Sequence, residues 1–569
     1  MATNEAIELS KLEHLKESSR QLRGTLAEEL EAESDHISGD AAQILKFHGS
    51  YQQDDRELRG RKNPDGTPAG KHYMFMVRTR IPGGRLTSEQ LLAELDLCDR
   101  VGNGTLRITT RQGLQLHGVL KKNLRETIRE INRIQLTTFC ACGDVERNVM
   151  CCPAPIRNNP VRDRMQELAW RTAEHLKPRT TAYYEIWLRD EEGHRTDATE
   201  FQPVEEPIYG ERYLPRKFKT GFALPEDNCI ELLANDLGFL GIVEDGRLIG
   251  FNVYVGGSMG VTPANKKTFP ALAKKLTFVT PDEVIPIAEA IVKVQRDFGN
   301  RSDRKQARMK YLIARWGLER FAETVAEYYG RPLSEPRPED PRATDDHMGW
   351  HEQGDGRWFL GIKIPNGRIQ DTDAVRYKTG LRELCSRYRR ELRLTAQQSL
   401  IVCDIEPAER ADIDAILADH GIRPAEELTP IERLSIACPA LPTCGLAVTE
   451  SERVMPAVLE AIRNELAARG LEASELAVHM TGCPNGCART YTSDIGLVGK
   501  ARGKYTIYLG GNAVGTALGF VYQDLVPLEE IPARLAPVFD LYCAERQDGE
   551  SFGDFCRRVG PERLASLQS

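Results

Sequence analysis

Alternating and helix-periodic hydrophobic patterns divide the chain into strands and helices. Residues 72–81, HYMFMVRTRI, alternate apolar and polar positions with a period of two, which is typical of a half-buried strand. After a PGG turn, TSEQLLAELDLCDRVG repeats its apolar positions every 3.6 residues behind Thr87, a helix-capping residue. TLRITTRQGLQLHGVL at 105–120 then returns to a strand pattern. We therefore expect a strand, a helix and a strand in succession.

Parts of this unit occur a second time. RIPGGRL at 80–86 is matched by KIPNGRI at 363–369, LRITTRQGLQL at 106–116 by LRLTAQQSLIV at 392–402, and NVMCCPAP at 148–155 by SIACPALP at 435–442. These pairs are 283, 286 and 287 residues apart, and GFNVYVGGSMG at 250–260 is echoed by KYTIYLGGNAVG at 504–515. Chance similarity of short strand–turn patterns is the alternative. The regular spacing favours an internal duplication, whose two halves would pack about a pseudo-twofold axis with a large ligand between them.

The remaining pattern completes a mixed α/β chain in which helices cover antiparallel-leaning sheets. A Pro-rich, charged stretch at 328–347 has no apolar period and predicts the linker between the halves. Helices are predicted at 5–33, 161–177, 282–297 and 454–469.

Charge and composition narrow the class of protein. The chain carries a net charge of −8, and its first 50 residues are acidic, which excludes a nucleic-acid-binding arm. No run of about 18 apolar residues and no secretory signal is visible, so we expect a cytoplasmic protein without a membrane partner. Basic residues nevertheless cluster in LPRKFKT and NRSDRKQARMKYL, which indicates pockets for small anions.

Four of the 14 cysteines stand in a regular pattern. Cys438 and Cys444 form C-x5-C, and after 38 residues Cys483 and Cys487 form C-x3-C within HMTGCPNGCARTYTSDIGLVGK. A zinc site is the plainer interpretation, but zinc sites typically use closer pairs, and four thiolates with looser spacing favour a four-iron cluster. The segment 482–486 is expected to end a strand and open a helix, with Cys487 near the helix N-terminus.

The motifs resemble those of the sulfite and nitrite reductase haemoprotein family. The match rests on the two cysteine pairs within TGCPNGC…GLVGK and on KFHGSYQQDDRE, RITTRQGLQLHG, LPRKFKT and GNRSDRK, which together span nearly the whole chain. Within the family, the chain is most similar to the assimilatory sulfite reductase haemoproteins. The resemblance implies two ferredoxin-like half-domains and two sirohaem-binding α/β domains about a pseudo-twofold axis. It places an N-terminal arm at 1–60, the half-domains at 61–145 and 345–425, and the sirohaem-binding domains at 146–335 and 426–569.

The same resemblance implies the cofactors and their ligands. Cys438, Cys444, Cys483 and Cys487 would hold a [4Fe-4S] cluster, and Cys487 would also be the axial ligand of a sirohaem iron. Sirohaem carries many carboxylates, which require cationic or hydrogen-bonding partners. A strand with period two would place these partners on one face, although a solvated strand face is the alternative; they are Arg107, Thr109, Arg111, Gln115 and His117.

The implied reaction is the six-electron reduction of sulfite to hydrogen sulfide. A small oxyanion that loses its oxygens as water needs cations and proton donors around it. By resemblance these groups are Arg78, Arg147, Lys217 and Lys219, each of which taken alone would be an ordinary surface charge. Nitrite-reducing relatives have RKFN where this chain has RKFK, so Lys219 favours sulfite.

An electron donor must be a separate protein, because no Walker A or G-x-G-x-x-G motif is present; the Gly-rich YLGGNAVGTALG is better explained by close backbone approach to the macrocycle. A flavoprotein that oxidises NADPH is favoured over ferredoxin. The acidic N-terminal arm is a candidate docking element, or a helix that packs on the protein's own surface. Two alternatives stay open: a ferredoxin-dependent sulfite or nitrite reductase, and a zinc-stabilised anion-binding protein.

Overall fold

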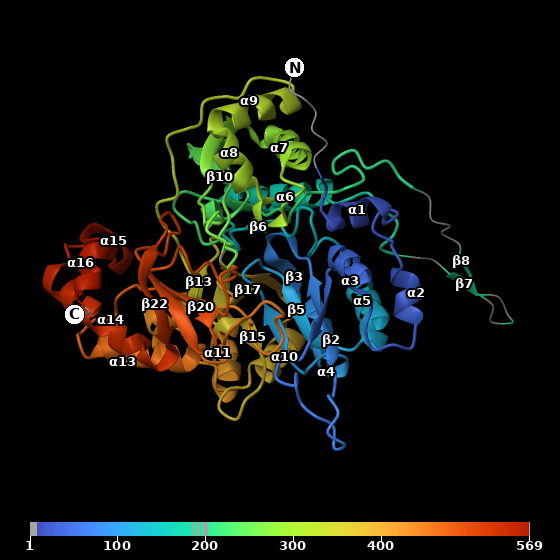
Figure 1. Cartoon of the computed structure of the whole chain (residues 1–569). Coiled ribbons are helices and arrows are strands. Elements are labelled where there is room, and N and C mark those ends of the chain that lie inside the picture. The colour runs from blue at the N-terminus through green and yellow to red at the C-terminus, as the bar shows by residue number, and fades with distance from the viewer. Residues whose placement is uncertain are drawn as a thin grey trace.

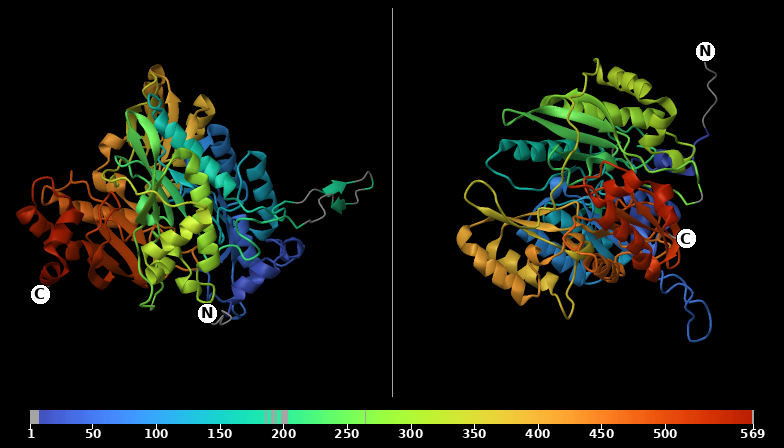
Figure 2. Two further views of the ribbon diagram at one scale, coloured as in Figure 1. Left: turned by 90° about the horizontal axis from the view of Figure 1, so that it is seen from above. Right: turned by 90° about the vertical axis from the view of Figure 1, so that its left-hand side faces the viewer.

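The computed structural model describes residues 8–184, 187–189, 192, 195–197, 203–263 and 265–567. These residues form four five-stranded sheets and one two-stranded sheet, with helices around them (Figure 1). The predicted mixed α/β class is thereby confirmed. The two-stranded hairpin, β7 (Trp187–Arg189) and β8 (Arg195–Asp197), projects from the body of the molecule (Figure 2).

Two of the sheets have the ferredoxin-like arrangement. The first has the order β1-β2-β5-β4-β15 and the second β13-β14-β17-β16-β3. Helices α4 and α10, one from each half, pack against each other. The bounds are β1 (Ser50–Asp54), β2 (Tyr73–Thr79), β3 (Arg85–Thr87), β4 (Leu106–Ile108), β5 (Leu114–Val119), β13 (Gly349–Glu352), β14 (Trp358–Ile362), β15 (Arg368–Ile369), β16 (Glu391–Leu394) and β17 (Leu400–Ile405), with helices α4 (Ser88–Arg100), α5 (Leu124–Arg133), α10 (Tyr377–Tyr388) and α11 (Arg410–Asp419).

The repeated PGG and PNG turns carry a strand across from each half into the other. β3, which follows PGG, pairs with β16 of the second half, and β15, which follows PNG, pairs with β4 of the first. Only glycine fits at the crossing points. A Cβ on Gly84 would lie 2.5 Å from the carbonyl oxygen of Leu394, and a Cβ on Gly367 would lie 2.1 Å from that of Ile108. The two halves therefore exchange strands reciprocally.

The single strand expected over 105–120 is a hairpin. β4 ends at Ile108, and the Thr109 hydroxyl oxygen accepts hydrogen bonds from the backbone N–H groups of Arg111 and Gly113, which closes a tight turn before β5. Gln112 has a left-handed φ of 52° within this turn. A period of two through the turn was therefore wrong, and residues 109–113 form a loop whose counterpart in the second half is 395–399.

The other two sheets are larger units with the same internal order. One runs β12-β11-β10-β9-β6 and the other β18-β19-β20-β21-β22, and in both the shortest strand and its next two neighbours are parallel. This shared order supports the duplication. The strands are β6 (Met150–Cys151), β9 (Thr220–Ala223), β10 (Leu237–Glu244), β11 (Arg247–Val255), β12 (Lys274–Val279), β18 (Ile436–Ala437), β19 (Val478–Thr481), β20 (Ile495–Ala501), β21 (Lys504–Leu509) and β22 (Phe520–Pro527).

Helices cover the outer faces of these two sheets (Figures 1 and 2). The helices predicted at 161–177, 282–297 and 454–469 are present as α6 (Pro160–His175), α7 (Val284–Phe298) and α13 (Met455–Ala467). Further helices are α3 (Gly39–Leu45), α8 (Met309–Trp316), α9 (Leu318–Tyr329), α12 (Pro430–Leu434), α14 (Ile531–Glu545), α15 (Phe552–Val559) and α16 (Pro561–Ser566). No helix among the described residues is long and apolar enough to cross a bilayer.

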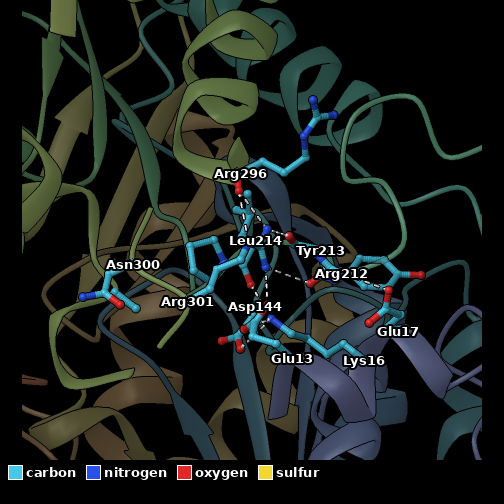
Figure 3. Close-up of polar contacts among 12 residues, drawn as sticks. Glu13, Lys16, Glu17, Asp144, Arg212, Tyr213, Leu214, Arg296, Asn300 and Arg301 are labelled. Carbon is cyan, nitrogen blue, oxygen red and sulfur yellow. Dashed lines mark hydrogen bonds and ion pairs between the residues drawn. The ribbon is translucent and has the colours of Figure 1, made fainter. Parts of the chain in front are cut away.

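The N-terminal arm is anchored on the protein itself. The helix predicted over 5–33 starts outside the described residues, and its described part is broken into α1 (Lys11–Ser18) and α2 (Leu26–Glu31) because residues 20–22 have left-handed φ angles. Lys16 of α1 is fully buried, donates to the carbonyl oxygen of Leu214 at 2.8 Å and lies 3.9 Å from Asp144 (Figure 3). Glu13 of the same helix pairs with Arg301 (Figure 3). The structure thus shows α1 packed on its own chain.

Candidate active site

The four predicted cluster cysteines converge at the end of the β18–β19 pair. Cys438 directly follows β18, and its backbone N–H donates to the carbonyl oxygen of Met480 at 3.1 Å. Cys483 and Cys487 lie in the loop after β19, where the N–H of Gly482 donates to the sulfur of Cys438 at 3.4 Å. Cys444 lies in the neighbouring loop. In that loop the backbone N–H of Val448 donates to the carbonyl oxygen of Gly482 at 2.8 Å.

The four sulfurs lie near one another. Burial raises the pKa of Cys438 first, and the charges of Cys487, Cys483 and Cys444 raise it further. Four thiolates held together are the ligand set of a [4Fe-4S] cluster. The arrangement therefore fits the predicted [4Fe-4S] cluster.

Cys487 does not lie at a helix N-terminus, so that prediction was wrong. Residues 482–494 form a succession of turns, and Arg489 takes a left-handed φ of 53° that helical geometry does not allow. Cys487 is exposed, whereas Cys438 and Cys483 are buried. Because Cys487 is exposed, its sulfur could bind a second group on the side that faces away from the loop.

Arg489, which was not among the predicted site residues, connects the 482–494 loop to residues of both halves. Its guanidinium pairs with Glu231 at 2.5 Å and donates to the carbonyl oxygens of Thr110 and Ala396, which lie in the two pseudo-equivalent turns. The Thr110 hydroxyl in turn donates to the carbonyl oxygen of Cys487 at 3.1 Å. The buried pair fixes Cys487 against the 109–113 loop. Its only sequence signal was its position two residues after Cys487.

Three of the predicted catalytic cations are neighbours. Phe218 is buried, so Lys217 and Lys219 on either side of it point to the opposite face, as their spacing predicted. The backbone N–H of Arg147 donates to the carbonyl oxygen of Phe218 at 3.2 Å, which lays Arg147 beside them. Arg308 adds a further positive charge and is held by Asp236 at 2.7 Å. In the sequence, Arg308 was indicated only by its place in the basic run NRSDRKQARMKYL.

The lysines have lowered proton affinity. Burial, followed by the positive charges of Arg111 and Arg308, lowers the pKa of Lys219 to about 7, against an opposing contribution from Asp236 and Cys487. Burial, followed by Arg147 and Arg216, holds the pKa of Lys217 well below its usual range. A lysine that titrates near neutrality can both bind an anion and donate a proton to it.

Arg78 lies on the adjoining strand β2, opposite Gln115 of β5. Its guanidinium donates to the sulfur of Cys142 at 2.9 Å and lies 6.0 Å from the centre of the Tyr51 ring. Tyr51 also interacts electrostatically with Arg147. Arg78 therefore joins the group of Arg147, Lys217 and Lys219 through Tyr51.

The five predicted sirohaem contacts divide into two groups. Arg107 pairs with Glu452 at 2.9 Å and donates to the carbonyl oxygen of Ala437, so it supports the strand β18 that ends just before Cys438. The Thr109 hydroxyl closes the turn described above. Arg111, Gln115 and His117 are the other three, of which Gln115 and His117 are buried.

Several buried polar atoms around the turn lack a hydrogen-bond partner among the described residues. They include the Nε of Arg111, both ring nitrogens of His117 and the Oε1 of Gln397 in the equivalent turn of the second half. A buried polar atom without a partner is costly and indicates a missing ligand or water. These atoms, the exposed Cys487 and the lysines fit a polyanionic macrocycle with an iron to be ligated.

Gly511, in the Gly-rich turn after β21, lies against the chain's own backbone, and close approach of this turn to the macrocycle stays a prediction. A Cβ on Gly511 would lie 2.3 Å from the carbonyl oxygen of Ser493. The turn packs on the chain's own backbone next to the cluster loop.

Comparisons with known proteins agree with this arrangement. The profile of the nitrite and sulphite reductase 4Fe-4S domain matches residues 168–333 and 433–568. That of the nitrite/sulfite reductase ferredoxin-like half domain matches 68–134 and 351–420, so both are found twice. The chain belongs to the nitrite and sulphite reductase family, and it is an enzyme of that family.

Individual relatives are similar over nearly their whole length. The sulfite reductase [NADPH] hemoprotein beta-component of Geobacillus thermodenitrificans is 46% identical over 97% of this chain and 96% of its own length. The sulfite reductase [ferredoxin] of Synechococcus elongatus is 44% identical over 98% and 90%. The solved structure of Mycobacterium tuberculosis NirA protein has the same fold, with a TM-score of 0.76 and 24% identity over 98% of this chain and 97% of that one.

Proposed function

We propose that this chain is the haemoprotein of an assimilatory sulfite reductase, which reduces sulfite to hydrogen sulfide in the cytoplasm. The observation that carries this proposal is the convergence of the four-cysteine group on a group of cations, with Lys219 close enough to Cys487 for the two charges to interact. The full-length similarity to sulfite reductase haemoproteins supports it.

The chain's own residues hold the cofactors. The [4Fe-4S] cluster would be bound by Cys438, Cys444, Cys483 and Cys487, and sirohaem by Cys487 with Arg111, Gln115 and His117 around it. Arg107 and Thr109 support these groups through Glu452 and the 109–113 turn. Bound together, the two cofactors would supply the electrons for the reduction of sulfite.

The cations bind and protonate the oxyanion. Arg78, Arg147, Lys217 and Lys219 hold the oxygens of sulfite through charge-assisted hydrogen bonds. Each oxygen that leaves as water requires protons, which a lysine with a pKa of about 7 can release and take up again at neutral pH. The low proton affinity of this pair is thus suited to repeated protonation.

The electron donor is proposed to be a flavoprotein that oxidises NADPH. The similarity to sulfite reductase [NADPH] hemoproteins supports this proposal. A sulfite reductase [ferredoxin] is similar to this chain at nearly the same sequence identity, so ferredoxin is the second candidate. Steady-state sulfide production by the purified holoenzyme with NADPH and flavoprotein, compared with reduced ferredoxin, separates them. Turnover with ferredoxin alone would contradict the flavoprotein proposal.

A single preparation tests the reaction. We expect strong visible absorption from sirohaem and sulfide formation when a chemical reductant and sulfite are supplied. A protein that binds sulfite with full cofactor content and forms no sulfide would contradict the proposed activity.

A further inference from the structure

A second group of metal-binding side chains lies in the first half of the molecule. The donor atoms of Cys152, Asp227, Cys229 and His347 all lie within 4.8 Å of one another, and all four residues are buried. The imidazole Nε2 of His347 is 3.7 Å from the sulfur of Cys152 and 3.3 Å from the Oδ2 of Asp227, and that carboxylate oxygen is 2.8 Å from the same sulfur.

This group occupies the pseudo-symmetric counterpart of the iron-sulfur site. Cys152 directly follows β6 as Cys438 directly follows β18, and each short strand pairs in parallel with the equivalent positions of its neighbour. Cys229 lies six residues after the end of β9, and Cys487 lies six residues after the end of β19. The first half has therefore kept two of the cysteine positions.

The other two cysteine positions are not cysteine in the first half. Pro225 stands two residues after β9, where Cys483 stands two residues after β19. A four-iron cluster needs four thiolates, so the first half cannot hold one in the same way. Asp227 and His347 complete the donor set instead, and the compact spacing leaves room for one ion.

The donor set is that of zinc. Two thiolates, one imidazole and one carboxylate are the ligand types that Zn²⁺ takes in tetrahedral sites, with bonds of about 2.0 to 2.3 Å. Tetrahedral geometry with such bonds separates a sulfur from a nitrogen by about 3.5 Å and a nitrogen from an oxygen by about 3.3 Å. The measured 3.7 and 3.3 Å are close to these values. Of the three separations given above, the 2.8 Å contact between the Cys152 sulfur and Asp227 is the one that must lengthen.

The surroundings balance the charge of such a site. Arg162 donates to the sulfur of Cys152 at 2.6 Å and to the Oδ2 of Asp227 at 2.7 Å. With Zn²⁺ bound, two thiolates, one carboxylate, the metal and Arg162 sum to zero charge, which a buried site requires. The Oδ1 of Asp227 is buried and makes no hydrogen bond within the described part of the chain.

The His347 ligand comes from the segment that joins the halves. Its backbone has a left-handed φ of 59°, an uncommon conformation for histidine, and its N–H donates to Asp345 at 2.8 Å. A Cβ on Gly361 would lie 1.8 Å from the carbonyl oxygen of His347, so β14 is also shaped around this residue. The imidazole is thus held in place over Cys152 and Asp227.

We propose that Cys152, Asp227, Cys229 and His347 bind one structural Zn²⁺ ion that fastens the inter-half segment to the first large sheet. The site is separate from the four cysteines of the cluster and takes no part in sulfite reduction.

Metal analysis of the holoenzyme tests the proposal. Protein from zinc-replete cells should contain about one zinc per chain in addition to its iron. X-ray absorption at the zinc edge should show two sulfur and two nitrogen or oxygen neighbours, which also excludes zinc misloaded at the four-cysteine site. Absence of zinc, or a zinc ion with four sulfur neighbours, would overturn the proposal.

Matched variants locate the ion. Cys152→Ala and Cys229→Ala should each lose the zinc, whereas Cys151→Ala, at the buried cysteine beside Cys152, should keep it. The wild-type zinc content and absorption spectrum do not depend on whether any variant folds. Zinc retained in a folded Cys152→Ala variant, or a Cys152–Cys229 disulfide found by mass spectrometry of the native chain, would contradict the assignment.

Discussion

At the scale of single residues, the proposed function places Lys219 between the sulfite-binding cations and the cysteine that would bind both cofactors. Its side chain is half-buried, lies near the positive charges of Arg111 and Arg308, and interacts electrostatically with Cys487. We therefore expect a substitution of Lys219 to affect the binding and reduction of sulfite more than the free energy of unfolding.

We expect Lys219→Asn to lower kcat/KM for sulfite by about a hundredfold, since the loss of one donor to a developing anion typically costs that much. Sulfide formation by the holoenzyme with a chemical reductant measures it. Lys122→Asn, at an exposed lysine, is the matched control and should leave turnover unchanged. Unchanged sulfite turnover in Lys219→Asn would refute the role proposed for this residue.

The pH dependence of sulfite binding should report the same lysine. Because its pKa is about 7, Lys219 is protonated and attracts the anion below pH 7 and loses its charge above it. KM for sulfite should therefore rise as pH increases through 7. In Lys219→Arg, which stays charged throughout, the rise should be reduced to the part due to the titration of sulfite itself. Identical pH profiles for the two proteins would contradict a titrating Lys219.

At this scale, the relative placement of residues close together in the sequence could be predicted, whereas contacts between distant segments could not. The spacing of Lys217 and Lys219 was enough to place both on one face, because Phe218 between them is apolar. Arg489 and Glu231 could not be found, because their pairing joins positions 258 residues apart. The contacts of Arg107 with Glu452 and of Thr109 within its turn could not be predicted from the strand pattern, and the contact of both residues with sirohaem stays a prediction.

At the scale of elements, the exchanged strands β3 and β15 are the features most sensitive to change. The glycines before them meet the backbone of the other half within 2.5 Å of where a Cβ would lie. A side chain at either crossing would have to push one half away from the other.

We expect Gly367→Ala to lower the free energy of unfolding by more than 2 kcal/mol, from its φ of 74° and its contact with the carbonyl oxygen of Ile108. Gly356→Ala is the matched control, since Gly356 has a φ of 88° with nothing within 4 Å. It should cost only about 1 kcal/mol, the effect of φ alone. Denaturant unfolding measures both, and equal losses would show that the crossing is not tight.

The elements show why local pattern and final structure differ. The strands and most helices follow the hydrophobic period, as in β2, α4 and α13. The hairpin at 105–120 and the turns after Cys487 do not, because side-chain hydrogen bonds and left-handed residues override the period there. The hairpin and these turns both lie next to the candidate active site.

At the scale of the whole molecule, the two halves are interlocked rather than placed side by side. One continuous core includes residues of both ferredoxin-like sheets and of the first large sheet, while the last sheet has a core of its own. The exchanged strands and Arg489 connect these parts.

Cutting the segment between the halves should therefore not separate them. With a protease site inserted at the exposed Glu335, the cleaved chain should elute as one particle in native size-exclusion chromatography and come apart only in denaturant. Two independent particles under native conditions would contradict the interlocking.

The strand exchange also bears on how such a protein began. If a single half once existed as a separate chain, the strand after its PGG-like turn could have been accepted only by another copy, so the early form was a two-chain assembly with equivalent sites. Joining the copies end to end freed each site to change alone. One site then kept its four cysteines, and the other kept two cysteines beside a histidine supplied by the joining segment.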